Sequence, residues 1–156
     1  MENDEVKLKA WESERQKLMD ARMKNRRLFV CALNWMRLLE RGEDLLPYFQ
    51  ERDLKKIGIY GAGELAEILI QEMRRKNEVE IVCLIDQSAA VCREKFGLPV
   101  YLPEEFAAIE DVDMVVVTAI TYFDAISEKL LRICPEMPVV SLEGIIWKRI
   151  SEECYE

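Results

Sequence analysis

The stretch KIGIYGAGEL, residues 56–65, decides the fold of this chain. Its apolar residues 57–60 predict a buried strand, and the glycines that follow predict a tight turn. Residues 63–76 then read GELAEILIQEMRRK, with apolar side chains on one helical face and three basic residues at the end. This pattern predicts an amphipathic helix whose basic last turn complements the helix dipole. A strand, a glycine turn and a helix in succession are typical of the first unit of a parallel α/β sheet.

Four further apolar segments continue the alternation of strand and helix. They are VEIVCLID at 79–86, LPVY at 98–101, DMVVVTA at 113–119 and PVVSL at 138–142. Between and after them we predict a short helix at 89–94, a helical turn at 103–106, a helix at 122–133 and a last helix at 143–150. Continuous apolar strands separated by helices predict a doubly wound, five-stranded parallel sheet with strand order 3-2-1-4-5.

A helical N-terminal extension, residues 1–53, is expected to precede this α/β domain, residues 54–156. We predict helices at 4–26 and 28–40 and a short helix at 45–49. Gly42 fits just past the end of the second helix, and Asp44 can cap the third. The second helix is the more apolar of the first two, so we expect it to cover one face of the sheet.

The first predicted helix is strongly charged and has only a thin apolar stripe. Leu8, Trp11 and Leu18 begin a heptad pattern, which then fades. Because so polar a helix is unstable alone in water, it either packs on its own domain or pairs with a second subunit. We favour pairing, either as a homo-oligomer or by docking to a partner enzyme.

Charge and patterning argue against several classes of protein. The net charge of −8 gives no basic surface for nucleic acid. The one basic run, residues 22–27, stands between acidic stretches and reads as a solvated helix face. No apolar stretch is long enough for membrane insertion, and the acidic start does not resemble a signal peptide. We therefore expect a cytoplasmic protein.

The chain contains no histidine and five cysteines without a C-x-x-C pair. The lack of histidine removes Ser-His-Asp and Cys-His catalysis and most transition-metal sites. We therefore predict no metal site and assign no catalytic residue. Cys31 and Cys83 lie inside apolar runs and are expected to be buried.

Three segments are predicted to meet at a candidate ligand site. In a doubly wound sheet, ligands bind beyond the carboxyl ends of the strands where the strand order reverses. Segments 60–65, 86–88 and 118–122 fall at that point. The candidate ligand-binding residues are Gly61, Ala62, Gly63, Glu64, Leu65, Asp86, Gln87, Thr118, Ala119 and Tyr122.

The glycine turn matches the dinucleotide pattern G-x-G-x-x-A. Gly61 permits the tight turn, Gly63 lets a phosphate approach the backbone, and Ala66 lets the helix pack closely on the strand. Asp86 ends the second strand, where a carboxylate binds ribose hydroxyls and favours NAD over NADP. The alternative is a purely structural turn, with Asp86 as a helix cap. Glu64 argues against a diphosphate, because its carboxylate would repel one.

The third segment also allows two interpretations. Thr118 and Thr121 could bond a ligand, and the ring of Tyr122 could stack on a base or sugar. Alternatively, Thr121 caps the next helix and Phe123 packs in the core.

With these residues in hand, a resemblance to known families is apparent. It is carried by IGIYGAGELAEIL, VCLIDQS, LPVYLPEEF, DMVVVTAITYFDAISEKL and PVVSLEGII, between about residues 54 and 147. These segments resemble NAD(P)-binding Rossmann-like domains of bacterial surface-polysaccharide synthesis. The same plan is similar to the nucleotide-sugar-binding N-terminal domain of sugar acetyltransferases and to sugar-nucleotide epimerases.

The resemblance implies that residues 61–63 form the phosphate turn and that Asp86 contacts a ribose or base. It also exposes a departure from the family pattern. Such epimerases use a Tyr-x-x-x-Lys pair, whereas the residues four positions after Tyr60, Tyr101 and Tyr122 are not lysines. A hexapeptide-repeat acetyltransferase domain is missing as well.

Three hypotheses of function follow from these observations. We favour an accessory, non-catalytic module that binds NAD or a nucleotide sugar. The second hypothesis is a sugar-nucleotide-modifying enzyme completed by a second subunit, with Asp86, Glu64, Tyr122 or Lys129 in catalysis. The third is a structural interaction protein whose nucleotide turn is empty and whose N-terminal helices carry the function.

Overall fold

The computed structural model describes residues 2–152, and it describes side chains from residue 4 onward. Its centre is a six-stranded sheet of order β3-β4-β2-β1-β5-β6. The strands are β1 (Lys56–Tyr60), β2 (Glu80–Ile85), β3 (Glu94–Lys95), β4 (Leu98–Tyr101), β5 (Met114–Val117) and β6 (Val139–Ser141). All neighbouring pairs are parallel except β3 and β4. The predicted Rossmann-like strand order is confirmed, with one antiparallel edge strand added.

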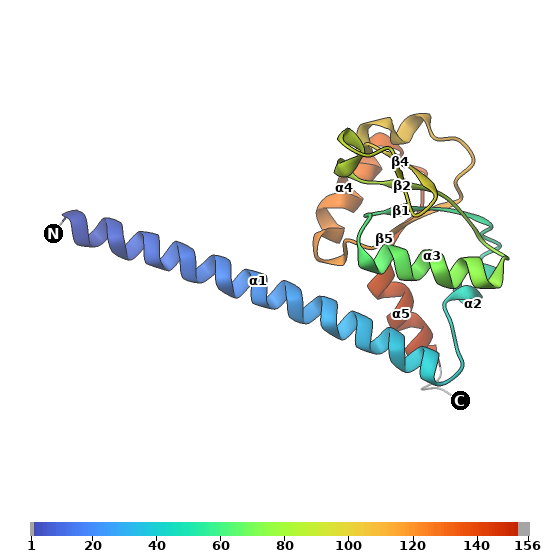
Figure 1. Ribbon diagram of the computed structural model, residues 1–156, viewed down its shortest axis with the longest axis horizontal. Helices are drawn as coiled ribbons and strands as arrows, with labels where there is room; N and C mark the ends of the chain where they lie inside the picture. The colour runs from blue at the N-terminus through green and yellow to red at the C-terminus, as the bar shows by residue number, and fades with distance from the viewer. Residues whose placement is uncertain (1, 153–156) are drawn as a thin grey trace.

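Helices cover both faces of this sheet (Figure 1). One face packs against α2 (Leu46–Gln50), α3 (Glu64–Lys76), α5 (Leu142–Ser151) and the C-terminal end of α1 (Glu2–Glu40). The other face packs against α4 (Phe123–Ile133) and the 3₁₀ turn η2 (Pro103–Ala108). Two shorter 3₁₀ turns, η1 (Gln87–Ala90) and η3 (Ile120–Tyr122), follow β2 and β5. Residues of β1 and β5 alternate between the two layers, whereas in β2 the consecutive residues Val82 and Cys83 pack in the same layer, where the register with β1 shifts.

The helix predicted at 89–94 is wrong. The chain makes only the 3₁₀ turn η1 and then enters β3, which pairs antiparallel with β4. Two loop residues join these strands, and both have positive φ, 54° at Phe96 and 74° at Gly97. A two-residue loop of this kind matches the twist of a hairpin. This hairpin was not predicted, because phenylalanine is rare at a position with positive φ.

The N-terminal residues form one continuous helix, α1, rather than two. Every side chain from residue 4 to residue 30 is exposed. From Cys31 onward the helix packs on the domain, and Trp35 and Leu38 join the same core as the sheet. Figure 1 shows the blue N-terminal half projecting away from the rest of the molecule. Among the helices described, none is long and apolar enough to cross a membrane.

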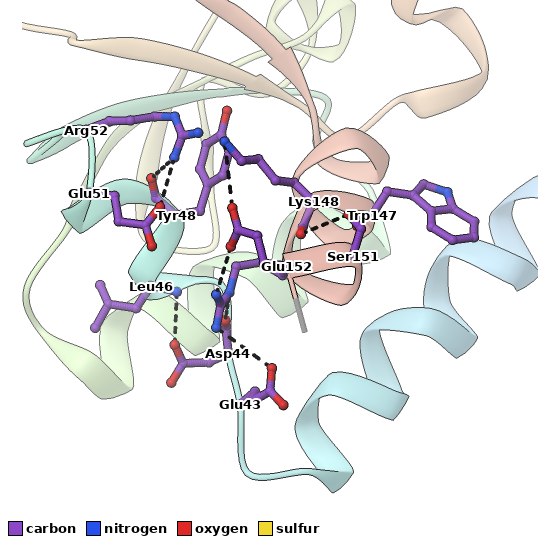
Figure 2. A network of polar contacts seen from close by, with 11 residues as sticks. Glu43, Asp44, Leu46, Tyr48, Glu51, Arg52, Trp147, Lys148, Ser151 and Glu152 are labelled. Atoms are coloured by element: carbon purple, nitrogen blue, oxygen red, sulfur yellow. Dashed lines mark hydrogen bonds and ion pairs between the residues drawn. The ribbon is translucent and has the colours of Figure 1, made fainter. Parts of the chain in front are cut away.

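A polar network joins the start of α2 to α5 (Figure 2). The N-cap of α2 is Leu45 and not the predicted Asp44. The Asp44 carboxylate nevertheless accepts a hydrogen bond from the Leu46 N–H at 3.0 Å. Arg149 of α5 donates to the Asp44 carbonyl at 3.1 Å, and its guanidinium lies 3.8 Å from Glu43. The Arg52 guanidinium stacks over the ring of Tyr48, with its Cζ 3.8 Å from the ring centre. These contacts fix the segment between α1 and the sheet.

Candidate functional site

Backbone hydrogen bonds bring the three predicted segments together at the carboxyl ends of β1, β2 and β5. The Gly61 N–H donates to the Ile85 carbonyl and the Thr118 N–H donates to the Tyr60 carbonyl, both at 2.9 Å. The Thr118 hydroxyl also donates to the Tyr60 carbonyl, at 3.2 Å. The glycine turn therefore sits between the ends of its two neighbouring strands.

A pocket of about 400 Å³ opens at this edge of the sheet. All of the predicted residues except Gln87 and Tyr122 line it. Two further residues, Leu28 and Ala32 of α1, form part of its wall. Sequence reasoning missed these two, because nothing in the pattern of α1 shows which of its turns passes the glycine loop. The volume lies within the range of small-ligand sites.

Positions 61 and 63 of the turn are both glycine, but for different reasons. Gly61 has a φ of +110°, and a Cβ there would lie 2.6 Å from the Thr118 hydroxyl oxygen. Its glycine is therefore required by the fold. Gly63 has extended backbone, and a Cβ there would meet no atom within 4 Å. The fold therefore does not require glycine at position 63. A phosphate that approaches the backbone at this position would require it.

Asp86 combines both roles considered for it from the sequence. One carboxylate oxygen accepts the Ser88 N–H at 2.8 Å and caps η1. The other accepts the Ala62 N–H at 3.1 Å and so braces the glycine turn against β2. Asp86 also lines the pocket. Because an ionised carboxylate has about four acceptor positions, two hydrogen bonds within the protein leave room for ribose hydroxyls.

Helix α3 begins at the mouth of the pocket. Its N-cap is Gly63, and Ala66 in its first turn is completely buried against the strand, as the fingerprint requires. The first-turn N–H groups of such a helix attract anions. Glu64 is exposed at the same turn and opposes this attraction.

Lys95 is a cation beside the glycine turn that sequence reasoning did not identify. It comes from the edge strand β3, and its ammonium donates to the Ala62 carbonyl at 2.6 Å. It reaches the turn only because β3 folds back beside β4. No local signal in the sequence placed it there.

Tyr122 lies against α1 instead of lining the pocket. The Lys24 ammonium sits 4.5 Å from the centre of its ring and 3.2 Å from its hydroxyl. Helix α4 is preceded by Tyr122 at the N-cap, so Thr121 does not cap it. Phe123 is half-buried and packs at the edge of the core.

Lys129 and the two cysteines considered from the sequence are held by an ion pair or by burial. The Lys129 ammonium pairs with Glu104 at 2.9 Å, which raises the pKa of Lys129. Burial raises the pKa of Cys31 and of Cys83 to about 11. Both thiols stay protonated at neutral pH and behave as the buried apolar groups predicted. Cys154 lies outside the described residues. Within residues 4–152, no group of three or more potential ligands could hold a metal ion.

One protein-family model matches this chain. Residues 53–138, more than half of the chain, match the model of a family described as C2185-like, N-terminal. The chain matched no curated protein.

Two solved structures resemble the chain at low sequence identity. One is UDP-D-quinovosamine 4-dehydrogenase from Vibrio fischeri, at 21% identity and a TM-score of 0.49, covering 56% of this chain and 77% of that one. The other is a candidate myo-inositol dehydrogenase from Sinorhizobium meliloti 1021, at 18% identity and a TM-score of 0.42, covering 56% of this chain and 27% of that one.

Proposed function

The chain belongs to the C2185-like N-terminal family, and we propose that its glycine-turn pocket binds a nucleotide-type ligand, NAD or a nucleotide sugar. The observation that carries this proposal is the open space at Gly63. A glycine that the fold does not need, at the N-terminus of a helix and inside a pocket, is what close approach of a phosphate requires.

The proposed ligand lies across the strand ends with its phosphate toward the start of α3. Its ribose hydroxyls bond the free acceptor positions of Asp86, and Thr118 and Ala119 contact the far side. Lys95 adds positive charge on the Ala62 side of the turn. Glu64 sets a limit on this arrangement, because its carboxylate must turn outward or bond a sugar hydroxyl.

We assign this module an accessory, non-catalytic role in bacterial polysaccharide or sugar-nucleotide metabolism in the cytoplasm. Tyr122 and Lys129, two of the groups considered for catalysis, are held by Lys24 and Glu104. Neither lines the pocket. Because the chain has no histidine, the residues that line the pocket are better suited to binding a ligand than to transferring a proton.

The test is binding of NAD, NADP and UDP-linked sugars, measured by thermal shift and calorimetry. A ligand that binds only the folded state raises its stability by about 2.7 kcal/mol at a hundredfold excess over Kd. The variant Gly63→Val should abolish that shift while costing about 1 kcal/mol or less in the free protein, as for a capping position. Gly144→Val is the control, since Gly144 is an exposed residue of α5 away from the pocket, and a Cβ there would meet only the Ser141 Cβ at 4.0 Å. Unchanged binding by Gly63→Val would show that the pocket is misassigned.

One observation favours the structural alternative, a turn without a ligand. Both oxygens of Asp86 already hold backbone N–H groups of the protein itself. If this bracing is the whole role of Asp86, none of the nucleotides will shift the melting temperature of the wild-type protein.

A further inference from the structure

Helix α1 carries an exposed seam at alternating spacings of three and four residues, the spacing of a coiled coil. Its ten positions are Leu8, Trp11, Arg15, Leu18, Arg22, Asn25, Phe29, Ala32, Met36 and Leu39. Of the six large apolar side chains among them, each is at least 42% exposed, and Phe29 is 66% exposed. The heptad begun by the first of these residues therefore extends along the whole helix.

The opposite face of α1 is the one that contacts its own domain. There Lys24 meets Tyr122, Arg27 forms a bidentate pair with Glu143, and Trp35 is buried. At about 100° per residue, Lys24 and Arg27 lie about a third to half a turn around the helix from the seam, whereas Trp35 lies only about 40° from Leu39 and about 60° from Ala32. In the single chain every seam position is exposed except Ala32, which is partly buried where it lines the pocket.

The order of residues along the seam is symmetric about its middle. Large apolar residues occupy both ends, and polar Arg22 and Asn25 occupy the centre. We propose that a second copy of this chain packs antiparallel on the seam. Leu8 then faces Leu39, Trp11 faces Met36, and Leu18 faces Phe29. Every large apolar side chain of the seam meets another, as hydrophobic burial favours.

At Arg15, charge favours the antiparallel orientation over the parallel one. In a parallel pair in register, Arg15 would face Arg15 and Arg22 would face Arg22, which is repulsive. In the antiparallel pair, Arg22 faces the Asn25 amide, which can accept its hydrogen bonds. The two domains then sit on opposite sides of the helix pair.

The same pairing completes the pocket. Ala32 belongs to the seam and also lines the glycine-turn pocket. The residue that faces Ala32 is Arg15 of the second copy, so its guanidinium reaches the mouth of a pocket walled by Glu64 and Asp86. Resting here on the proposed function, we assign Arg15 as the cation that offsets these carboxylates when an anionic nucleotide binds.

Cross-linking tests the pairing independently of any ligand. In a Cys92→Ser, Cys134→Ser, Cys154→Ser background, the double variant Leu18→Cys, Phe29→Cys should form a disulfide-linked dimer under mild oxidation. Leu18→Cys alone should not, because the two copies of residue 18 lie far apart. Lys17→Cys with Phe29→Cys is the control placed off the seam. Cross-linking by Leu18→Cys alone, or a monomer in sedimentation of the wild type, would overturn the proposal.

Nucleotide binding tests the role of Arg15 on the same dimer. Arg15→Ala should weaken binding of NAD or a UDP-linked sugar about tenfold, the cost of one charge-assisted hydrogen bond. Lys17→Ala should leave affinity unchanged, because Lys17 is exposed and lies off the seam. Equal affinity of Arg15→Ala and wild type would remove Arg15 from the site. If no nucleotide binds the wild type, the proposed function fails while the cross-link still decides the pairing.

Discussion

Two halves of α1 share one helical geometry and differ in almost everything else. Trp11, in the projecting half, is 59% exposed, and the Arg15 guanidinium lies 5.6 Å from the centre of its ring. Trp35, in the packed half, is 2% exposed and donates its indole N–H to Glu72 at 2.8 Å. The difference teaches that the helix does not need tertiary contacts along its whole length. Once the packed half has formed, extending the helix by further residues costs little free energy, because the unfavourable step in helix formation is nucleation.

The largest expected difference between the two halves of α1 is the loss of stability when the tryptophan of each half is replaced by alanine. Trp35→Ala should lower the free energy of unfolding by about 3–5 kcal/mol, because it leaves a cavity and removes the hydrogen-bond donor of one buried Glu72 oxygen. Trp11→Ala in dilute monomer should change it by about 0.5 kcal/mol or less, as for other surface positions. Urea unfolding measures both. Equal losses would mean that the projecting half has a partner within its own chain.

The second expected effect is a pH dependence at the contact between α1 and α3. Burial raises the pKa of Glu72, although hydrogen bonds from Leu45 and Trp35 partly oppose the shift. The folded protein therefore holds this proton more tightly than the unfolded chain. The contribution of Glu72 to stability is fully present below its unfolded pKa and declines as pH rises toward the folded value.

Glu72→Gln removes this titration. The stability difference between wild type and Glu72→Gln should therefore be larger at pH 4 than at pH 7, measured by urea unfolding at both pH values. A difference that instead grows with pH would show that the two hydrogen bonds outweigh burial.

The smallest expected effect lies where the two halves join. Arg27 is half-exposed and binds both carboxylate oxygens of Glu143, at 2.9 and 2.8 Å from its Nε and Nη2. Such a pair contributes about 0.2–1 kcal/mol and is weakened by salt. Arg27→Gln should cost that much in thermal unfolding at low salt and less at high salt. Lys9→Gln, which breaks only the exposed pair with Glu5, should cost less.

Local pattern was enough to predict the strand order and most of the pocket. The carboxyl ends of β1, β2 and β5 must meet when the strands are parallel, so Gly61, Asp86 and Thr118 follow from their positions after apolar runs. The position of the Tyr122 side chain could not be predicted in this way, because it could point either toward the glycine turn or toward α1. Lys24 holds it on the α1 side.

The sequence by itself determined most of the strands and helices, since apolar periodicity and glycine positions act over a few residues. The exception is the segment 87–97, where a predicted helix is replaced by the 3₁₀ turn η1 and the edge strand β3. The sequence also determined the need for glycine in the turn. Only the tertiary structure decided that Gly61 serves the fold while Gly63 faces open space. It likewise decided that Leu28 and Ala32 wall the pocket and that Lys95 reaches the Ala62 carbonyl. These contacts join residues far apart in the chain, so they depend on how whole elements pack and not on any local pattern.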